Sequence, residues 1–132
     1  VAKMLVRFVE KTKEKGEFLV KEGLVKDVRE IIDIHLVSGP ITIVHGDLGL
    51  TNIMLVGMDL KFIDFEHVVL GPLALELAPG LFWRDKNCLP TEVMIDELNK
   101  LGIDISMSDV VKMLPIYEKL QLIANKRRSQ NA

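Results

Sequence analysis

Three oxygen-bearing side chains, Asp47, Asn52 and Asp64, form the set of groups that phosphoryl transfer needs. The reaction places charge on the phosphate oxygens, so Mg²⁺ must bridge them, and Mg²⁺ prefers oxygen ligands. Asn52 and Asp64 can supply such ligands. Asp47 can orient an incoming hydroxyl and accept its proton. The sequence therefore predicts a magnesium-dependent phosphotransfer site built on these three residues.

Three neighbours of this set have supporting roles. We expect His45 to pack beneath the loop and to fix it by hydrogen bonds, and Gly46 to let the backbone pass close to other groups. Glu66 follows Asp64 by two positions and is a secondary candidate for contact with substrate or metal. These residues complete the candidate site.

Short β-forming runs are expected to position the site. Residues 41–44 are largely β-branched and predict a buried strand, and the polar, glycine-bearing segment 45–52 predicts a loop. A hairpin should follow, with strands at 53–56 and 60–64 and a turn at 57–59. We expect this hairpin to bring positions 52 and 64 opposite each other.

Helical patterns surround the hairpin. Apolar spacing and terminal signals predict five helices, at residues 1–15, 24–37, 72–82, 91–101, and from Ser106 or Ser108 to about Arg127. Pro115 should bend the last helix or mark its true start. The expected fold class is α+β and mainly helical. One domain spans 1–132, with helices at 1–40, the catalytic loop and hairpin at 41–66, and a helical remainder at 67–132.

Composition restricts the class of protein. The 132 residues carry a formal net charge of -2, and 48% of them are hydrophobic. No basic field predicts binding to nucleic acid or to a membrane, and no apolar run has the length of a membrane span. The single cysteine, Cys88, cannot form an internal disulfide, which fits a reducing compartment. A cytoplasmic location is expected.

The catalytic string resembles a known family. His-x-Asp-x-x-x-x-Asn followed by Asp-Phe is the pattern of the kinase catalytic and metal loops. The variant His45-Gly46-Asp47, with Asp64-Phe65-Glu66, resembles the aminoglycoside phosphotransferase, choline kinase and homoserine kinase group. The stretch from Gly71 to Ala78 is similar to that group as well. The resemblance is specific from about residue 41 to residue 78.

The resemblance implies a site and a fold. It implies that Asp47 is the catalytic base, that Asn52 and Asp64 hold Mg²⁺ beside ATP, and that His45 supports the loop. It also implies the C-terminal lobe (C-lobe) of the kinase-like fold. Glu76 stands where the group usually has aspartate, so the geometry of the catalytic loop is altered if that carboxylate anchors it.

The other half of a kinase nucleotide site has no counterpart in this sequence. The residues before His45 show no glycine-rich loop and no strand lysine, so the N-terminal lobe (N-lobe) is expected to be missing or supplied by another chain. Whether the chain alone is an enzyme therefore stays open.

Several functions remain in competition. The first is transfer of the ATP γ-phosphate to a hydroxyl of a small molecule. The second is a non-catalytic C-lobe remnant that binds a partner or forms a homodimer. An atypical protein kinase and a metal-dependent phosphohydrolase are further alternatives.

Overall fold

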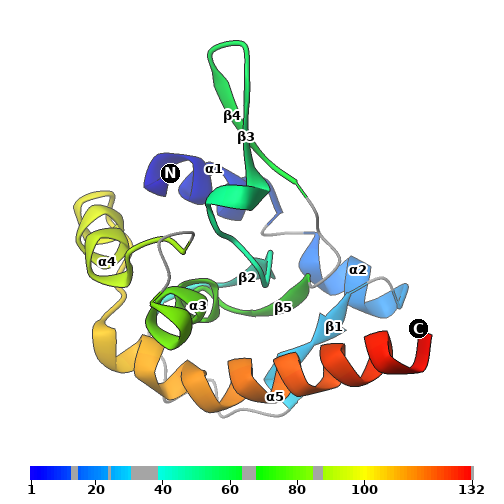
Figure 1. The fold of residues 1–132 in the computed structure, drawn as a ribbon. Helices are drawn as coiled ribbons and strands as arrows, with labels where there is room; N and C mark the ends of the chain where they lie inside the picture. Colours follow the sequence, from blue (N-terminus) through cyan, green and yellow to red (C-terminus); the bar gives the residue numbers. More distant parts are fainter. Residues whose placement is uncertain (13–14, 24, 31–38, 64–67, 85–87, 132) are drawn as a thin grey trace.

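A computed structural model of the chain describes residues 1–12, 15–23, 25–30, 39–63, 68–84 and 88–131. Along it, helices come first, short strands follow, and further helices come last (Figure 1). The elements are α1 (Ala2–Thr12), α2 (Gly16–Lys21), β1 (Lys26–Asp27), the 3-10 turn η1 (Val28–Glu30), β2 (Ile41–Val44), the 3-10 turn η3 (Leu50–Asn52), β3 (Ile53–Val56), β4 (Asp59–Phe62), β5 (Val69–Pro72), α3 (Ala74–Trp83), α4 (Thr91–Lys100) and α5 (Met107–Asn131).

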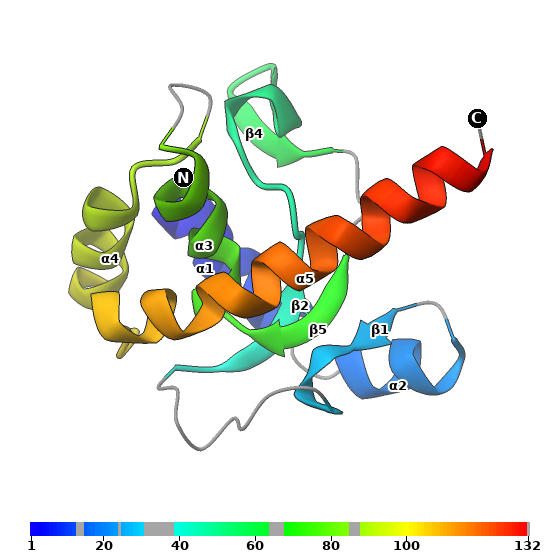
Figure 2. The same cartoon turned by 60° about the horizontal axis from the view of Figure 1, so that its bottom comes forward.

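The larger sheet has three strands, in the order β1-β5-β2 (Figure 2). Strand β5 runs antiparallel to β2 and parallel to β1. The β-branched residues of β2 explain its burial, since such side chains pack well on a pleated surface. The sheet anchors the start of the catalytic loop, because Val44 at the end of β2 is fully buried opposite Val69.

The second sheet is the hairpin β3–β4, which projects away from the helices (Figure 1). Its register pairs Ile53 with Phe62 and Val56 with Asp59, which leaves Gly57 and Met58 as the two-residue turn. Gly57 has φ +63°, a value that glycine adopts without strain. The predicted hairpin is therefore confirmed, with a turn one residue shorter than predicted because Asp59 already belongs to β4.

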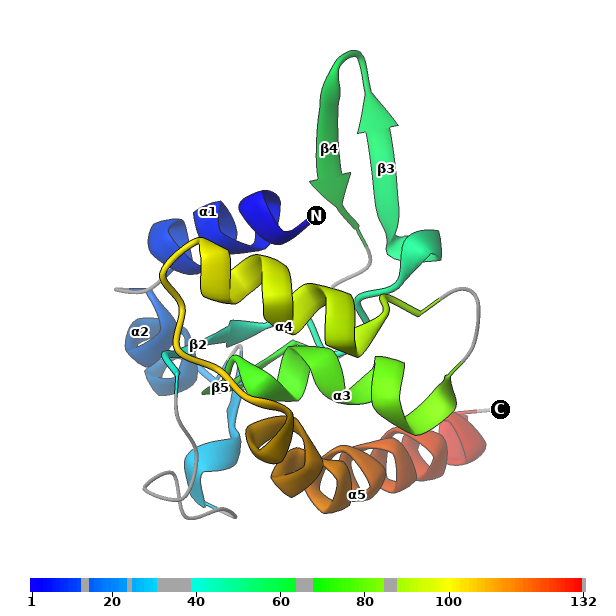
Figure 3. The same cartoon turned by 90° about the vertical axis from the view of Figure 1, so that its left-hand side faces the viewer.

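Helix α3 lies between α4 and α5 (Figure 3) and is buried over most of its length. It approaches the start of α4 closely: a Cβ on Gly80 would lie 2.2 Å from the carbonyl oxygen of Leu89. Helix α1 buries Leu5 and Val9 against the same core. The apolar core thus joins the helices that surround the catalytic loop.

The start and end signals of the later helices are confirmed. Pro90 precedes α4, and Gly102 ends it with φ +88°. Ser106 caps α5: its N–H donates to the Asp109 carboxylate at 2.9 Å, and the Asp109 N–H donates back to the Ser106 hydroxyl at 3.3 Å. The helix runs through Pro115, so this residue does not mark its start.

The prediction of a helix over 24–37 is wrong where the structure describes it. Residues 26–27 form β1 and residues 28–30 form η1, while the remainder lies outside the described residues. Two further elements, α2 and β5, were not predicted. The chain nevertheless combines helices with small sheets, as an α+β fold requires. Among the described residues, no helix has the length and apolarity needed to cross a membrane.

Candidate functional site

The predicted catalytic loop leaves β2 after Val44 and re-enters a strand at Ile53. Gly46 has φ +91°, in the left-handed region that favours glycine, and this lets the chain turn directly after His45. Within the loop, His45, Leu48 and Asn52 are buried and Asp47 is exposed. The loop therefore exposes the acidic side chain of Asp47 to solvent, while the residues on both sides of it hold the loop against the core.

His45 links the loop to the hairpin. Its ring is fully buried, its Nδ1 accepts the Asp47 N–H at 3.2 Å, and its Nε2 lies 2.6 Å from the carbonyl oxygen of Ile63. Because Nδ1 accepts, Nε2 must carry the proton and donate to the carbonyl. The ring of Phe62 meets the imidazole edge-on at 6.5 Å. The buried ring thus packs beneath the loop and bonds to it, as the sequence predicts for its position, while a role of His45 in catalysis stays a prediction.

Glu76 on α3 anchors the loop from below. Its two carboxylate oxygens accept the backbone N–H of His45 at 2.7 Å and that of Gly46 at 3.3 Å. Burial raises the pKa of this carboxyl to about 7, although both N–H groups act to lower it, and the negative charge of Asp47 raises it further. The glutamate reaches the loop in spite of its extra methylene.

Asn52 holds Asp47 in place. Its Nδ2 donates to the Asp47 carbonyl oxygen at 2.8 Å and to an Asp47 carboxylate oxygen at 3.3 Å. The Ile63 N–H donates to the Asn52 carbonyl at 2.9 Å. Asn52 thus faces Ile63, one position short of the expected Asp64. The structure brings together His45, Asp47 and Asn52 as the sequence predicts.

The two remaining candidates, Asp64 and Glu66, lie outside the described residues. In the parts of the chain that the structure describes, no group of three or more His, Cys, Asp or Glu side chains could hold a metal ion. The magnesium set therefore stays a prediction. Asn52 fits it, because both hydrogen bonds of its side chain use the amide nitrogen and the amide oxygen is the atom that it can offer to a cation.

Sequence reasoning missed an aromatic cluster beside the loop. Trp83 Nε1 donates to the Tyr117 hydroxyl at 2.7 Å, and the Phe82 ring packs on both residues. Burial raises the pKa of Tyr117, and the charge of Asp47 adds to this effect. Cys88 forms an isolated β-bridge with Gly49 of the loop. The only sequence signal was the cluster of aromatic residues at 82–83.

Comparison with known proteins gives a single match. No curated protein and no solved structure matches the chain significantly. The model of the phosphotransferase enzyme family matches residues 5–95, which is more than half of the chain. This span contains His45, Asp47, Asn52 and Glu76, the residues that build the loop described above. The chain belongs to the phosphotransferase enzyme family.

Proposed function

We propose that the chain is the C-lobe of a kinase that transfers the γ-phosphate of ATP to a hydroxyl of a small molecule. One observation carries the proposal: the Asp47 side chain is exposed, yet Asn52 Nδ2 donates hydrogen bonds to both its carbonyl oxygen and its carboxylate. An acidic group held in this way is prepared to receive a proton from a bound hydroxyl. Membership of a phosphotransferase family supports the same reading.

The chemistry assigned to Asp47 is general-base catalysis. Its carboxylate accepts the proton of the substrate hydroxyl while the hydroxyl oxygen forms a bond to the γ-phosphorus. The bond from that phosphorus to the bridging oxygen breaks, and ADP leaves with the electron pair. Glu76 and His45 fix the backbone that leads into Asp47, and Asn52 fixes the carbonyl that follows its side chain, so that the position of the carboxylate costs no reorganisation during the reaction.

Asn52 and Asp64 would hold Mg²⁺ in this proposal, and Glu66 is a secondary candidate. The ion would neutralise charge on the transferred phosphate. Asn52 is suited to this role because it sits at the base of the hairpin, directly beside Asp47. Asp64 follows Ile63, whose N–H and C=O are both bound to the loop.

The other half of the nucleotide site would come from an N-lobe or from a partner chain. Strand β3 supports this part of the proposal, because Met54, Leu55 and Val56 are all exposed on it. Three successive exposed apolar residues on a projecting strand are typical of a surface that another unit covers. A non-catalytic module that dimerises through this strand is the second candidate, and the same residues favour it.

The test is phosphoryl transfer by the purified chain, followed as ADP release with ATP, Mg²⁺ and a panel of small hydroxylated compounds. We expect Asp47→Asn to remove the transfer and Asp104→Asn, at another exposed aspartate, to leave it unchanged. Equal transfer by the Asp47→Asn variant would overturn the assignment of the base. A native chain that transfers nothing but forms dimers would favour the second candidate.

A further inference from the structure

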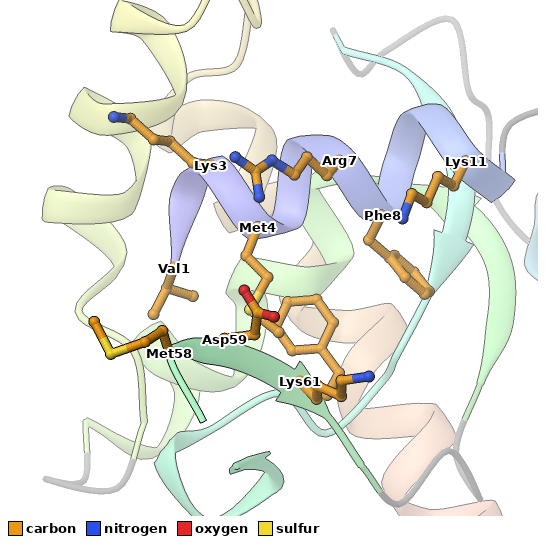
Figure 4. Close-up of a pocket in the computed structure, with 10 residues that line it drawn as sticks. Val1, Lys3, Met4, Arg7, Phe8, Lys11, Met58, Asp59 and Lys61 are labelled. Atoms are coloured by element: carbon orange, nitrogen blue, oxygen red, sulfur yellow. The ribbon is translucent and has the colours of Figure 1, made fainter. Parts of the chain in front are cut away.

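A cavity separates α1 from the hairpin. It has a volume of about 610 Å³ and is lined by residues of α1, of strand β4 and of the hairpin turn (Figure 4). Figure 4 shows Met4 and Phe8 directed from α1 towards β4. Asp47 and Asn52 do not line it. The cavity is therefore separate from the proposed site of phosphate transfer.

Cationic side chains dominate its rim. Lys3, Arg7 and Lys11 follow each other at intervals of four residues along α1, and Lys61 lines the cavity from β4. All four are exposed, and none forms an ion pair with an acidic side chain that the structure describes. Asp59 is the one acidic residue among the lining residues. The rim therefore favours a ligand with several negative charges.

The floor of the cavity is apolar. Met4, Phe8 and Phe62 line it, and the two phenylalanine rings meet edge-on at 5.7 Å. A ligand that fits both surfaces needs apolar groups directed to the floor as well as negative charges directed to the rim. Such a combination on one ligand indicates an amphipathic anion and not a bare phosphate.

The wall opposite α1 is a strand edge. Among the described residues β4 pairs only with β3, and β4 is the hairpin strand nearer α1 (Figure 3). The Ile63 N–H bonds to Asn52, and hydrogen-bonded pairs alternate along an antiparallel ladder. Residues 59 and 61 therefore bond to β3, while the backbone N–H and C=O of residues 60 and 62 point to the outer edge. This edge can accept a further strand.

We propose that this groove binds an extended segment of another protein in which acidic and apolar residues alternate. The segment would pair with the outer edge of β4, with its acidic side chains towards the cationic rim and its apolar side chains on the floor. Strand β4 runs steeply across α1 (Figures 1 and 3), so a segment paired with β4 would cross α1 and meet the cations of the rim as a group.

The test uses a synthetic eight-residue peptide of alternating Glu and Val, added to the intact chain and followed by nuclear magnetic resonance. Binding should slow amide hydrogen exchange at Leu60 and Phe62, whose N–H groups form the outer edge. The double variant Arg7→Glu with Lys11→Glu should weaken binding roughly tenfold or more, since attraction becomes repulsion at two sites. The matched control, Lys15→Glu with Lys21→Glu, reverses two exposed charges outside the cavity and should bind as the native chain does.

Two further measurements separate this proposal from the proposed function. Asp47→Asn should leave peptide affinity unchanged, because Asp47 does not line the groove. A peptide of alternating Lys and Val should not bind. The proposal is overturned if the Glu-Val peptide fails to bind, if it binds the double variant with native affinity, or if exchange at Leu60 and Phe62 is unaltered by binding.

Discussion

The carboxylate of Glu76 accepts a hydrogen bond from the backbone N–H of His45 at 2.7 Å, across thirty-one positions of the chain. This bond joins α3 to the first residue of the catalytic loop, and both residues are buried. A carboxylate that serves backbone N–H groups fixes the path of the chain and does not itself touch a reactant. Glu76 therefore fixes the start of the predicted catalytic loop from α3.

Protonation of Glu76 should make stability depend on pH. Its folded pKa is about 7, above the ordinary value of 4.5, so the folded state holds this proton more tightly than the unfolded state does. The stabilisation is complete below about pH 4.5 and is lost as the pH rises through about 7. We expect the free energy of unfolding to fall by roughly 3 kcal/mol over this interval, measured by urea denaturation at several pH values.

Glu76→Gln supplies the control for this effect. Glutamine keeps an acceptor for the His45 N–H but does not titrate, so the fall in stability between pH 4.5 and 7 should be absent from the variant. A native chain whose stability rises with pH over that interval would show that the two N–H groups outweigh burial and that the carboxyl is ionised throughout.

His45 should be present as the Nε2–H tautomer. The Asp47 N–H requires an acceptor at Nδ1, and the Ile63 carbonyl requires a donor at Nε2. The nitrogen chemical shifts of a selectively labelled histidine distinguish the two tautomers. A predominant Nδ1–H form would mean that the loop is held by other contacts.

The local signals of the sequence predicted the hairpin and the ends of the later helices. The β-branched run of β2, the turn at Gly57 and the cap at Ser106 act over a few residues, and each is found in the structure. The His45, Asp47 and Asn52 set was predicted because residue type and spacing determine its chemistry. These features needed no knowledge of distant contacts.

The errors arose where distant segments decide the structure. Strand β1 has two residues and exists because it pairs with β5, far along the chain. Val28 fits a helical apolar pattern, yet it is buried because Gly71 packs directly on it: a Cβ on Gly71 would lie 2.4 Å from Val28 Cγ2. Its apolar character reflects packing on the sheet. Periodicity alone cannot separate these two causes.

Asn52→Ala should loosen the catalytic loop. The substitution removes the donor to the Asp47 carbonyl and to its carboxylate, and the loss of each of these partly buried hydrogen bonds costs about 0.5–1.5 kcal/mol. Thermal unfolding should show this loss. The control Asn99→Ala, at an exposed position of α4, should change stability by less than about 0.5 kcal/mol. Equal stability of the two variants would contradict the bridging role of Asn52.

Asp47→Asn should leave the fold intact and remove catalysis. The Asp47 side chain is exposed, so the variant should unfold at nearly the native temperature. Loss of a general base lowers phosphoryl transfer by roughly 10²–10⁴-fold. The measurement is the ratio of transfer rates for the variant and the native chain under identical conditions. A ratio near one would assign proton acceptance to another group.

The most direct test of the central claim is calorimetric titration of the chain with ATP, with and without Mg²⁺, in parallel with the variant Asp64→Ala. A phosphotransferase half-site predicts magnesium-dependent binding to the native chain. It also predicts that Asp64→Ala removes this binding while circular dichroism shows an unchanged fold. A native chain that binds ATP equally well without Mg²⁺, or an Asp64→Ala variant that binds it as well as the native chain does, would contradict the assignment of residues 45 to 64 as a metal-dependent phosphotransfer site.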